Sequence, residues 1–161
     1  MAGAKQPVTV TINDDDVQKA IKKALRQTSD LSPALKAIGE HLVESTTDRF
    51  IDQQDPSGNP WEPLSVTTLK LRAKKGRSDS DILVGTGLEE LSKSINYQVT
   101  GNDLYVGSNK VYAAIHQFGG ETGAGSWFSG AVIPARPFIG LSDDDRDEVL
   151  ETLKEHLSQA F

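Results

Sequence analysis

A tight turn between two alternating segments constrains the fold of this chain more than any other feature. The turn is Gly101-Asn102, and it separates residues 94–100 from residues 104–106. In the first segment the side chains of Ile95, Tyr97 and Val99 alternate with polar ones, which is the period of a half-buried strand. A two-residue turn of this composition joins neighbouring antiparallel strands. We therefore predict an antiparallel hairpin at the centre of the chain.

Helical periodicity accounts for much of the remaining pattern. We predict helices over about 17–28 and 33–53, a short one after Ser65, others over 88–95 and 111–118, and a closing helix after Ser142. Ser32-Pro33 is interpreted as a helix cap followed by proline at the first helical position. The apolar faces are predicted to be Val17, Ile21, Ala24 and Leu25; Leu35, Ile38, Leu42 and Val43; Tyr112, Ile115 and Phe118; and Val149, Leu150, Leu153 and Leu157.

The remaining segments are predicted to be a strand and several loops. Residues 8–12 alternate as a strand does, 53–60 are dense in turn formers, and 133–139 are extended because of their prolines. The glycine-rich segment 119–130 is predicted to be a long mobile loop. With 161 residues, one domain is expected. The predicted fold is α+β: a single domain, 1–161, of four to five helices packed on a small antiparallel β-sheet with a long glycine-rich loop.

Composition excludes several classes of protein. The chain has no cysteine, which removes disulfides, thiolate metal sites and cysteine nucleophiles. Its net charge of −6 argues against non-specific nucleic-acid binding by the whole surface. No apolar run is long enough to span a membrane, and residues 1–7 lack the apolar segment of a secretion signal. We expect a soluble protein made and kept in a cytoplasm, with no membrane partner.

No catalytic, metal-binding or cofactor-binding constellation is found. The three histidines, His41, His116 and His156, lie in different predicted helices without a ligand partner at a suitable spacing. The runs 13–16 and 143–145 are acidic, but each stands where a helix begins and is interpreted as capping rather than as a cation site. The glycines of 119–125 lack the context of a phosphate-binding loop. We expect no cofactor and predict that the chain is not an enzyme.

Two segments are candidate contact surfaces. The basic run is Lys70, Arg72, Lys74, Lys75 and Arg77. Such a run contacts phosphate or an acidic protein surface, or is simply solvated. Trp127 and Phe128 lie in the glycine-rich segment and are either docking anchors or part of the chain's own core. Trp61 is predicted to be a core anchor, and His116 is expected to be satisfied by the adjacent loop.

Several segments in a fixed order suggest a family. They are Phe50 with DPSGNPWEPL (55–64) and a lysine-rich helix, ILVGTGL (82–88) before Ser94-Ile95, VGSN (106–109) before YAAIHQFG (112–119), and IPARPFIGLS (133–142). Together these segments resemble the phage virion morphogenesis family of tail-completion, or head–tail joining, proteins of Mu-like and P2-like phages. The resemblance covers residues 32–160, and residues 1–31 form the predicted N-terminal strand and helix.

The resemblance implies a structural protein that completes the phage tail or neck and joins tail to head. The resemblance also implies that related proteins form rings, commonly of six subunits. The implied partners are therefore further copies of the chain, tail-tube or tail-terminator proteins, head connector or neck proteins, and DNA that passes through without sequence-specific binding. The implied location is the virion tail or neck, after assembly in the host cytoplasm. The alternative is a nucleic-acid-binding accessory protein that uses residues 70–77.

A ring needs two different patches on each subunit, and four residues are candidates for them. These interface candidates are Trp127, Phe128, Arg136 and Phe138. Arg136 lies between two prolines, where a rigid backbone suits it either to a carboxylate of a neighbouring subunit or to an internal salt bridge. The basic run is the corresponding candidate for a contact with DNA in the channel or with a partner protein.

Overall fold

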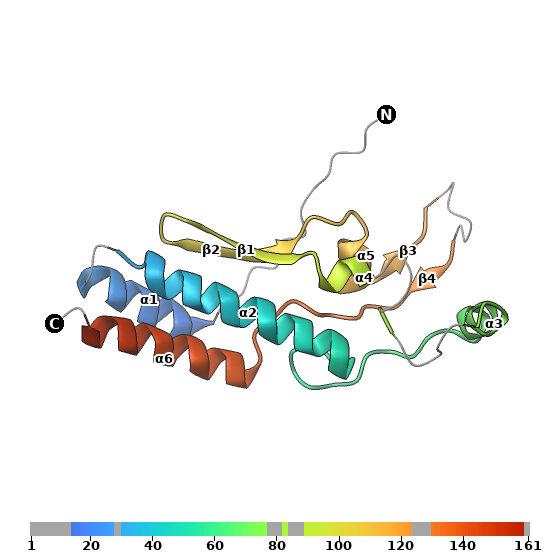
Figure 1. Cartoon of the computed structure of the whole chain (residues 1–161), viewed down its shortest axis with the longest axis horizontal. Coiled ribbons are helices and arrows are strands. Elements are labelled where there is room, and N and C mark those ends of the chain that lie inside the picture. Colours follow the sequence, from blue (N-terminus) through green and yellow to red (C-terminus); the bar gives the residue numbers. More distant parts are fainter. Residues whose placement is uncertain (1–13, 28–29, 77–81, 84–88, 124–129, 160–161) are drawn as a thin grey trace, which may run out of the picture.

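Three helices lie side by side and form one end of the molecule (Figure 1). The computed structural model describes residues 14–27, 30–76, 82–83, 89–123 and 130–159. The three helices are α1 (Asp15–Gln27), α2 (Ser32–Asp52) and α6 (Asp143–Gln159). Their buried side chains meet in one cluster, which we call the helical core: Val17, Ala24, Leu31, Ala34, Leu35, Ile38, Val149 and Leu153. The three predicted helices and most of their apolar faces are confirmed, although Leu25 is exposed.

The helix starts differ in one detail from the sequence-based expectation. Asp14 caps α1, since its carboxylate accepts the backbone N–H groups of Asp16 at 3.0 Å and Val17 at 2.9 Å. Ser32 was predicted to cap α2, but it lies inside the helix, and Leu31 is the cap residue. The Asp30 carboxylate instead accepts the Ser32 N–H at 2.9 Å. Asp30, three residues before Pro33, therefore supplies the side-chain cap that the sequence analysis predicted for Ser32.

The predicted hairpin is present and lies along α2. Strand β1 (Ile95–Thr100) pairs antiparallel with β2 (Asp103–Ser108), with Tyr97 opposite Val106. The turn needs Gly101, whose φ is +60°. The hairpin approaches α2 closely at Gly39, where an added Cβ would lie 2.4 Å from the Tyr97 ring. Glycine at this position lets the sheet pack directly on the helix backbone.

The second cluster of buried side chains, which we call the aromatic core, lies at the other end of α2. Its buried members are Phe50, Trp61, Leu83, Leu91, Ile95, Ala113, Phe138 and Ile139. The ring centroids of Trp61 and Phe138 lie 5.4 and 5.2 Å from that of Phe50. The indole N–H of Trp61 donates to the Pro137 carbonyl at 2.8 Å. The prediction that Trp61 is a core anchor is confirmed.

The remaining elements are short. They are α3 (Val66–Lys74), α4 (Glu89–Ser92), α5 (Ala113–Phe118), and a small hairpin of β3 (Gly120–Glu121) with β4 (Val132–Ile133). Ser65 caps α3 as predicted, accepting the Thr68 N–H at 3.2 Å. The predicted α+β class is confirmed, with two separate two-stranded sheets among the described residues. None of the helices described here is long and apolar enough to cross a membrane.

Two expectations about this region are corrected. The apolar face predicted for residues 111–118 is present only in part. Tyr112 packs against the aromatic core, but Phe118 is 60% exposed, and Ala113 and Gln117 are the buried residues of α5. The predicted loop 119–130 is paired at its base, where Gly120 lies opposite Ile133. Residues 124–129, with Trp127 and Phe128, lie outside the described residues, as do the predicted strand 8–12 and Arg77.

Candidate functional site

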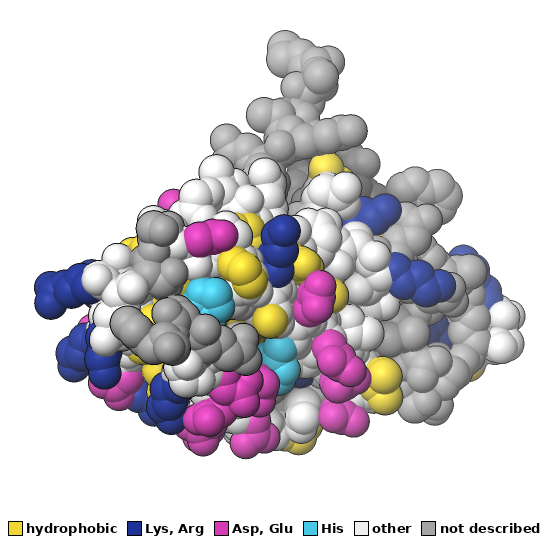
Figure 2. All heavy atoms as spheres, turned by 60° about the vertical axis from the view of Figure 1, so that its left-hand side comes forward, with side chains coloured by type: hydrophobic (Ala, Val, Ile, Leu, Met, Phe, Trp, Pro, Cys, Tyr) yellow, Lys and Arg dark blue, Asp and Glu magenta, His cyan; other side chains and the backbone are white. Residues whose placement is uncertain are grey.

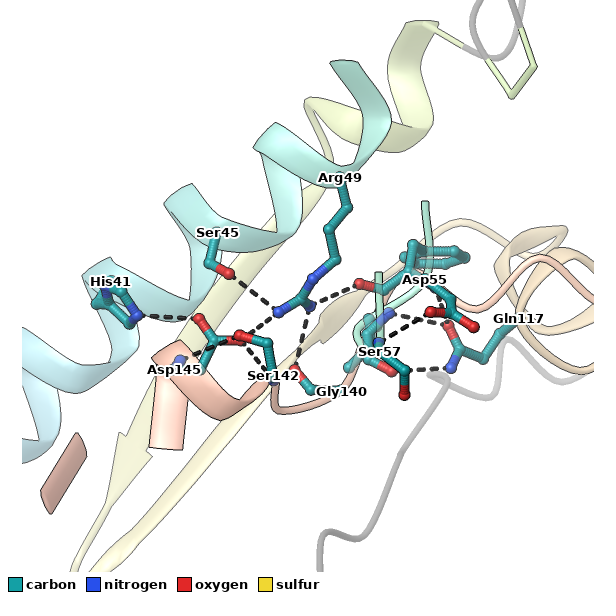
Figure 3. A network of polar contacts seen from close by, with 11 residues as sticks. His41, Ser45, Arg49, Asp55, Ser57, Gln117, Gly140, Ser142 and Asp145 are labelled. Atoms are coloured by element: carbon teal, nitrogen blue, oxygen red, sulfur yellow. Dashed lines mark hydrogen bonds and ion pairs between the residues drawn. The ribbon is translucent and has the colours of Figure 1, made fainter. Parts of the chain in front are cut away.

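A buried ion pair connects α2 to the start of α6 (Figure 3). Arg49 and Asp145 are both almost fully buried, and Arg49 Nη2 donates to Asp145 Oδ2. Nη1 of the same arginine donates to the Phe138 and Gly140 carbonyls at 3.0 and 3.1 Å, and Nη2 also donates to Ser45 Oγ at 3.0 Å. A buried arginine paired in this way leaves few donors without acceptors. The pair therefore holds residues 138–140 against α2.

Asp145 belongs to a cap at the start of α6. The Asp145 backbone N–H donates to Ser142 Oγ at 3.0 Å, and Asp145 Oδ2 accepts the Ser142 N–H at 2.9 Å, which is a reciprocal capping box. Burial by itself raises the pKa of Asp145, but hydrogen bonds from Ser45 and Ser142 and the charge of Arg49 hold it below its ordinary value. The interpretation of the acidic run 143–145 as a helix start, capped by Ser142, is confirmed.

His41 and Ser45 lie close to this pair without forming a catalytic relay. His41 Nε2 lies 2.9 Å from Asp145 Oδ1, while the Ser45 hydroxyl accepts its bond from Arg49. A serine nucleophile needs its hydroxyl bonded to the histidine base. These side chains therefore stabilise the joint between α2 and α6. In the described parts of the chain, no group of three or more His, Asp or Glu side chains is arranged to hold a metal ion.

An open acidic groove of about 670 Å³ lies over this joint. It runs along the second half of α2, the turn at 54–58 and the start of α6. Its carboxylates are Glu44, Asp48, Asp52, Asp55, Asp143, Asp144 and Asp145, and Arg49 and His41 also line it. Figure 2 shows acidic side chains gathered on the lower part of one face, with most lysines and arginines toward its margins. With seven carboxylates and one arginine in its lining, this groove is strongly acidic.

One turn fixes the end of the acidic groove. Asp55 accepts the backbone N–H groups of Ser57 and Asn59 at 2.8 and 2.9 Å, so residues 55–59 form a compact loop. Burial raises the pKa of Asp55, but the bonds from Asn59 and Ser57 lower it below its ordinary value overall. Asp55 is therefore charged at neutral pH, and its negative charge adds to that of the groove.

The acidic groove was not predicted, although the sequence contains a signal for part of it. Glu44, Asp48 and Asp52 are spaced by four residues, which places them in one row on a helix. The turn and the start of α6 join this row only in the folded chain. A sequence search for acidic rows on helices would find the first part of the groove but not the second.

The described part of the basic run lies on α3 and at its C-terminal end, at the far end of the molecule (Figure 1). Lys70, Lys74 and Lys75 are exposed, and Arg72 is half-buried. No residue of α3 is buried, and Val66 and Leu71 are 67% and 40% exposed. The structure therefore places the described part of this candidate surface well away from the buried ion pair.

Two of the interface candidates are held inside the chain. Phe138 is completely buried in the aromatic core, so its ring is not available on the surface to a neighbouring subunit. Arg136 is also buried, and it donates from Nε to the Glu62 carbonyl at 2.8 Å and from Nη2 to the Pro63 carbonyl at 3.0 Å. These partners are backbone carbonyls rather than the carboxylate that either expectation named. Arg136 therefore fixes residues 134–138 against residues 62–63.

The other two histidines, His116 and His156, lie in different surroundings. His156 Nε2 lies 2.9 Å from the Asp30 carbonyl oxygen. His116 was expected to be satisfied by the adjacent loop, but its buried Nδ1 has no hydrogen-bond partner among the described residues. Its ring packs edge-on against Tyr112 instead, with centroids 6.3 Å apart. Burial, together with the charge of Arg136, lowers the pKa of His116.

Buried Gln117 was not identified from the sequence as an important residue. Its Oε1 accepts the N–H groups of Phe138 and Ile139, each at 3.0 Å, and its Nε2 donates to the Ile139 carbonyl at 2.9 Å. The amide side chain thus forms hydrogen bonds with the backbone of an irregular segment, as a neighbouring strand would. Its position in an apolar segment, YAAIHQFG, is the one sign of this role that the sequence offers.

Comparisons with known proteins identify the family. The model of the phage virion morphogenesis family matches residues 12–158. The chain is 30% identical over 145 residues to the Mu-like prophage FluMu G protein 2 of Haemophilus influenzae, covering 89% of this chain and 91% of that protein. It is 34% identical over 127 residues to the protein named "Putative capsid assembly protein G" of Escherichia phage Mu, covering 78% and 79%. No solved structure matches the chain. The match over most of its length shows that the chain belongs to the phage virion morphogenesis family.

Proposed function

We propose that the chain completes the tail or neck of a phage particle and joins the tail to the head. The observation that carries this proposal is the family match, which spans nearly the whole chain. The phage Mu relative is named as a capsid assembly protein, and a joining protein acts where the finished capsid meets the tail. The proposed location of the chain is therefore the virion, at the tail end or neck.

In this proposal the chain acts as a ring of six copies around the channel through which DNA passes. Its further partners are the tail-tube or tail-terminator proteins on one side and the head connector or neck proteins on the other. A closed ring needs two different surfaces on each copy. A net charge of −6 suits a channel that conducts DNA without gripping it, since like charges repel. The proposed role is structural and includes no catalytic step.

The test is electron microscopy of lysates from the parent phage with an early stop codon in this gene. The expected result is filled heads beside separate tails, with joined particles restored when the purified chain is added. Joined, infectious particles in the stop-codon mutant would contradict the joining role. Lysates with tails but no filled heads would instead place the chain in capsid assembly.

A second candidate function is nucleic-acid binding through α3. The observation that favours it is the exposure of Lys70, Lys74 and Lys75 on one short helix. Phosphate contacts of this kind give an affinity that falls steeply with salt. The test replaces Lys74, Lys75 and Arg77 by glutamine and measures retention on duplex DNA at several salt concentrations. Unchanged retention would exclude this function.

A further inference from the structure

Helix α3 buries little of its surface against the described part of its own copy. It has nine residues, and none of them is buried. Isolated helices shorter than about 12–15 residues are marginal in water, and most of the stability of protein helices comes from packing of one face. The Ser65 cap adds only about 1 kcal/mol. Figure 1 shows α3 standing apart from the helices and sheets of the body. Among the described residues only Thr68, Leu69 and Arg72 of α3 are half-buried, so most of the helix surface is open to a further partner.

The side chains of α3 indicate what that surface must be. Between Ser65 and Gly76 the chain has four basic residues and no acidic one. Lys70 and Lys74 are spaced by one helical turn, about 6 Å along the axis. Val66 and Leu71 add exposed apolar area to the same short helix. A fitting surface is acidic, repeats its charges at helical spacing and offers some apolar contact.

The acidic groove has these properties. Glu44, Asp48 and Asp52 lie in one row along α2 and span about 12 Å, with the same four-residue repeat as the two lysines. Asp143 and Asp144 at the start of α6 add charge on the opposite wall. Pro56 and Leu141 also line the groove and supply apolar contact. Charge, spacing and apolar content of the two surfaces are complementary.

We propose that α3 of one copy docks in the acidic groove of the next copy. This inference rests on the proposed function, because it names the two surfaces that the ring uses. Since α3 and the groove are different patches, their contact is head-to-tail, the type of contact that closes into a ring. It also brings together the basic helix and the acidic groove of chains that otherwise repel one another at a net charge of −6.

A charge swap in the phage tests the contact. One variant carries Lys70→Glu, Lys74→Glu and Lys75→Glu, a second carries Glu44→Lys, Asp48→Lys and Asp52→Lys, and a third carries all six substitutions. The control reverses Lys19, Lys22 and Lys23, which are exposed on α1. Each gene is supplied to the phage with the stop codon, and the infectious titre is measured. Circular dichroism of each purified chain checks that it folds.

The first two variants are expected to lower the titre by about 100-fold or more, because like charges then face one another. The variant with all six substitutions is expected to regain most of the lost titre. The control is expected to match the wild type. The inference is overturned if the variant with all six substitutions does not recover the titre, or if either variant with three substitutions has a normal titre. Recovery also excludes DNA as the ligand of α3, since DNA does not change its charge.

Disulfide cross-linking tests the same contact directly. The natural chain has no cysteine, so introduced cysteines are the only ones that can pair. Lys74→Cys and Asp48→Cys are combined in one chain, and the product of mild oxidation is separated on a denaturing gel. A ladder of multiples is expected, whereas Lys22→Cys with Asp48→Cys gives none. If the wild-type gene is dispensable, the joining function fails, and a ladder still supports the contact. If the gene is required but assembled particles give no ladder, the contact fails and the joining function stands.

Discussion

The helical core and the aromatic core lie at opposite ends of α2 and are held together in different ways. In the helical core, side chains such as Leu35, Ile38 and Leu153 meet across three regular helices. In the aromatic core, residues 134–140 are irregular, and polar side chains bond to their backbone. The first end depends on apolar area and the second on a few buried hydrogen bonds. Single polar substitutions are therefore expected to affect the second end far more than the first.

The largest expected effect is that of Arg49→Met. The substitution leaves the buried Asp145 carboxylate without its cation and two carbonyls without donors. Loss of one partner from a buried ion pair costs about 3–5 kcal/mol of unfolding free energy. Urea denaturation measures this loss. The control is Arg26→Met at an exposed position on α1, for which the unfolding free energy is expected to change by no more than about 0.5 kcal/mol. A loss below about 1 kcal/mol would show that the ion pair does not hold residues 138–140.

The next effect is that of Gln117→Leu. The apolar replacement is similar in size, but it leaves the N–H groups of Phe138 and Ile139 without an acceptor. Each buried group without a partner costs about 1–3 kcal/mol, so a loss of at least about 2 kcal/mol is expected in urea. The comparison at the helical core is Leu35→Met, for which a loss below about 1.5 kcal/mol is expected. Equal losses at the two positions would remove the proposed difference between the ends.

A smaller effect concerns pH. The folded chain holds the pKa of His116 below its ordinary value of 6.5, so the unfolded chain takes up a proton at a higher pH than the folded one. The unfolding free energy is therefore expected to fall as pH drops below 6.5 and to level off below the folded pKa. His116→Gln is expected to remove this slope when denaturation curves are compared between pH 7 and pH 5. A slope that survives the substitution would come from another group.

The smallest effect is expected on α3. Val66→Ser and Leu71→Ser change side chains that are exposed in one copy, so the unfolding free energy is expected to change by no more than about 0.5 kcal/mol. The same two substitutions are expected to weaken ring assembly, which is measured as infectious titre in the stop-codon background. A large loss of stability in the isolated chain would mean that α3 packs on its own copy.

The regular parts of the fold could be predicted because their signals are local. Leu35, Ile38 and Leu42 repeat at helical spacing, and Gly101-Asn102 specifies a two-residue turn. The aromatic end could not be predicted in the same way. Arg49 and Arg136 donate to backbone carbonyls at residues 138, 140, 62 and 63, and a carbonyl has no signature in the sequence. From the sequence Phe138 is a candidate interface residue, since nothing local distinguishes a buried phenylalanine from an exposed one.

The candidate site also has one part with a local sequence signal and one part without. The basic run of α3 is contiguous, so the sequence identified it, and the structure adds that α3 has no buried residue. The acidic groove is assembled from α2, the turn at 54–58 and α6, of which only the row on α2 is visible in the sequence. A surface that three distant segments build becomes recognisable only after folding.

The most direct test of the whole account is a cryo-electron microscopy reconstruction of the neck of the joined particle. We expect six-fold density at the joint that fits the body formed by α1, α2 and α6. We also expect α3 of each copy to lie in the acidic groove of the next, against Asp48 and Asp52. Density for the chain elsewhere in the particle, or α3 folded back on its own copy, would contradict this arrangement.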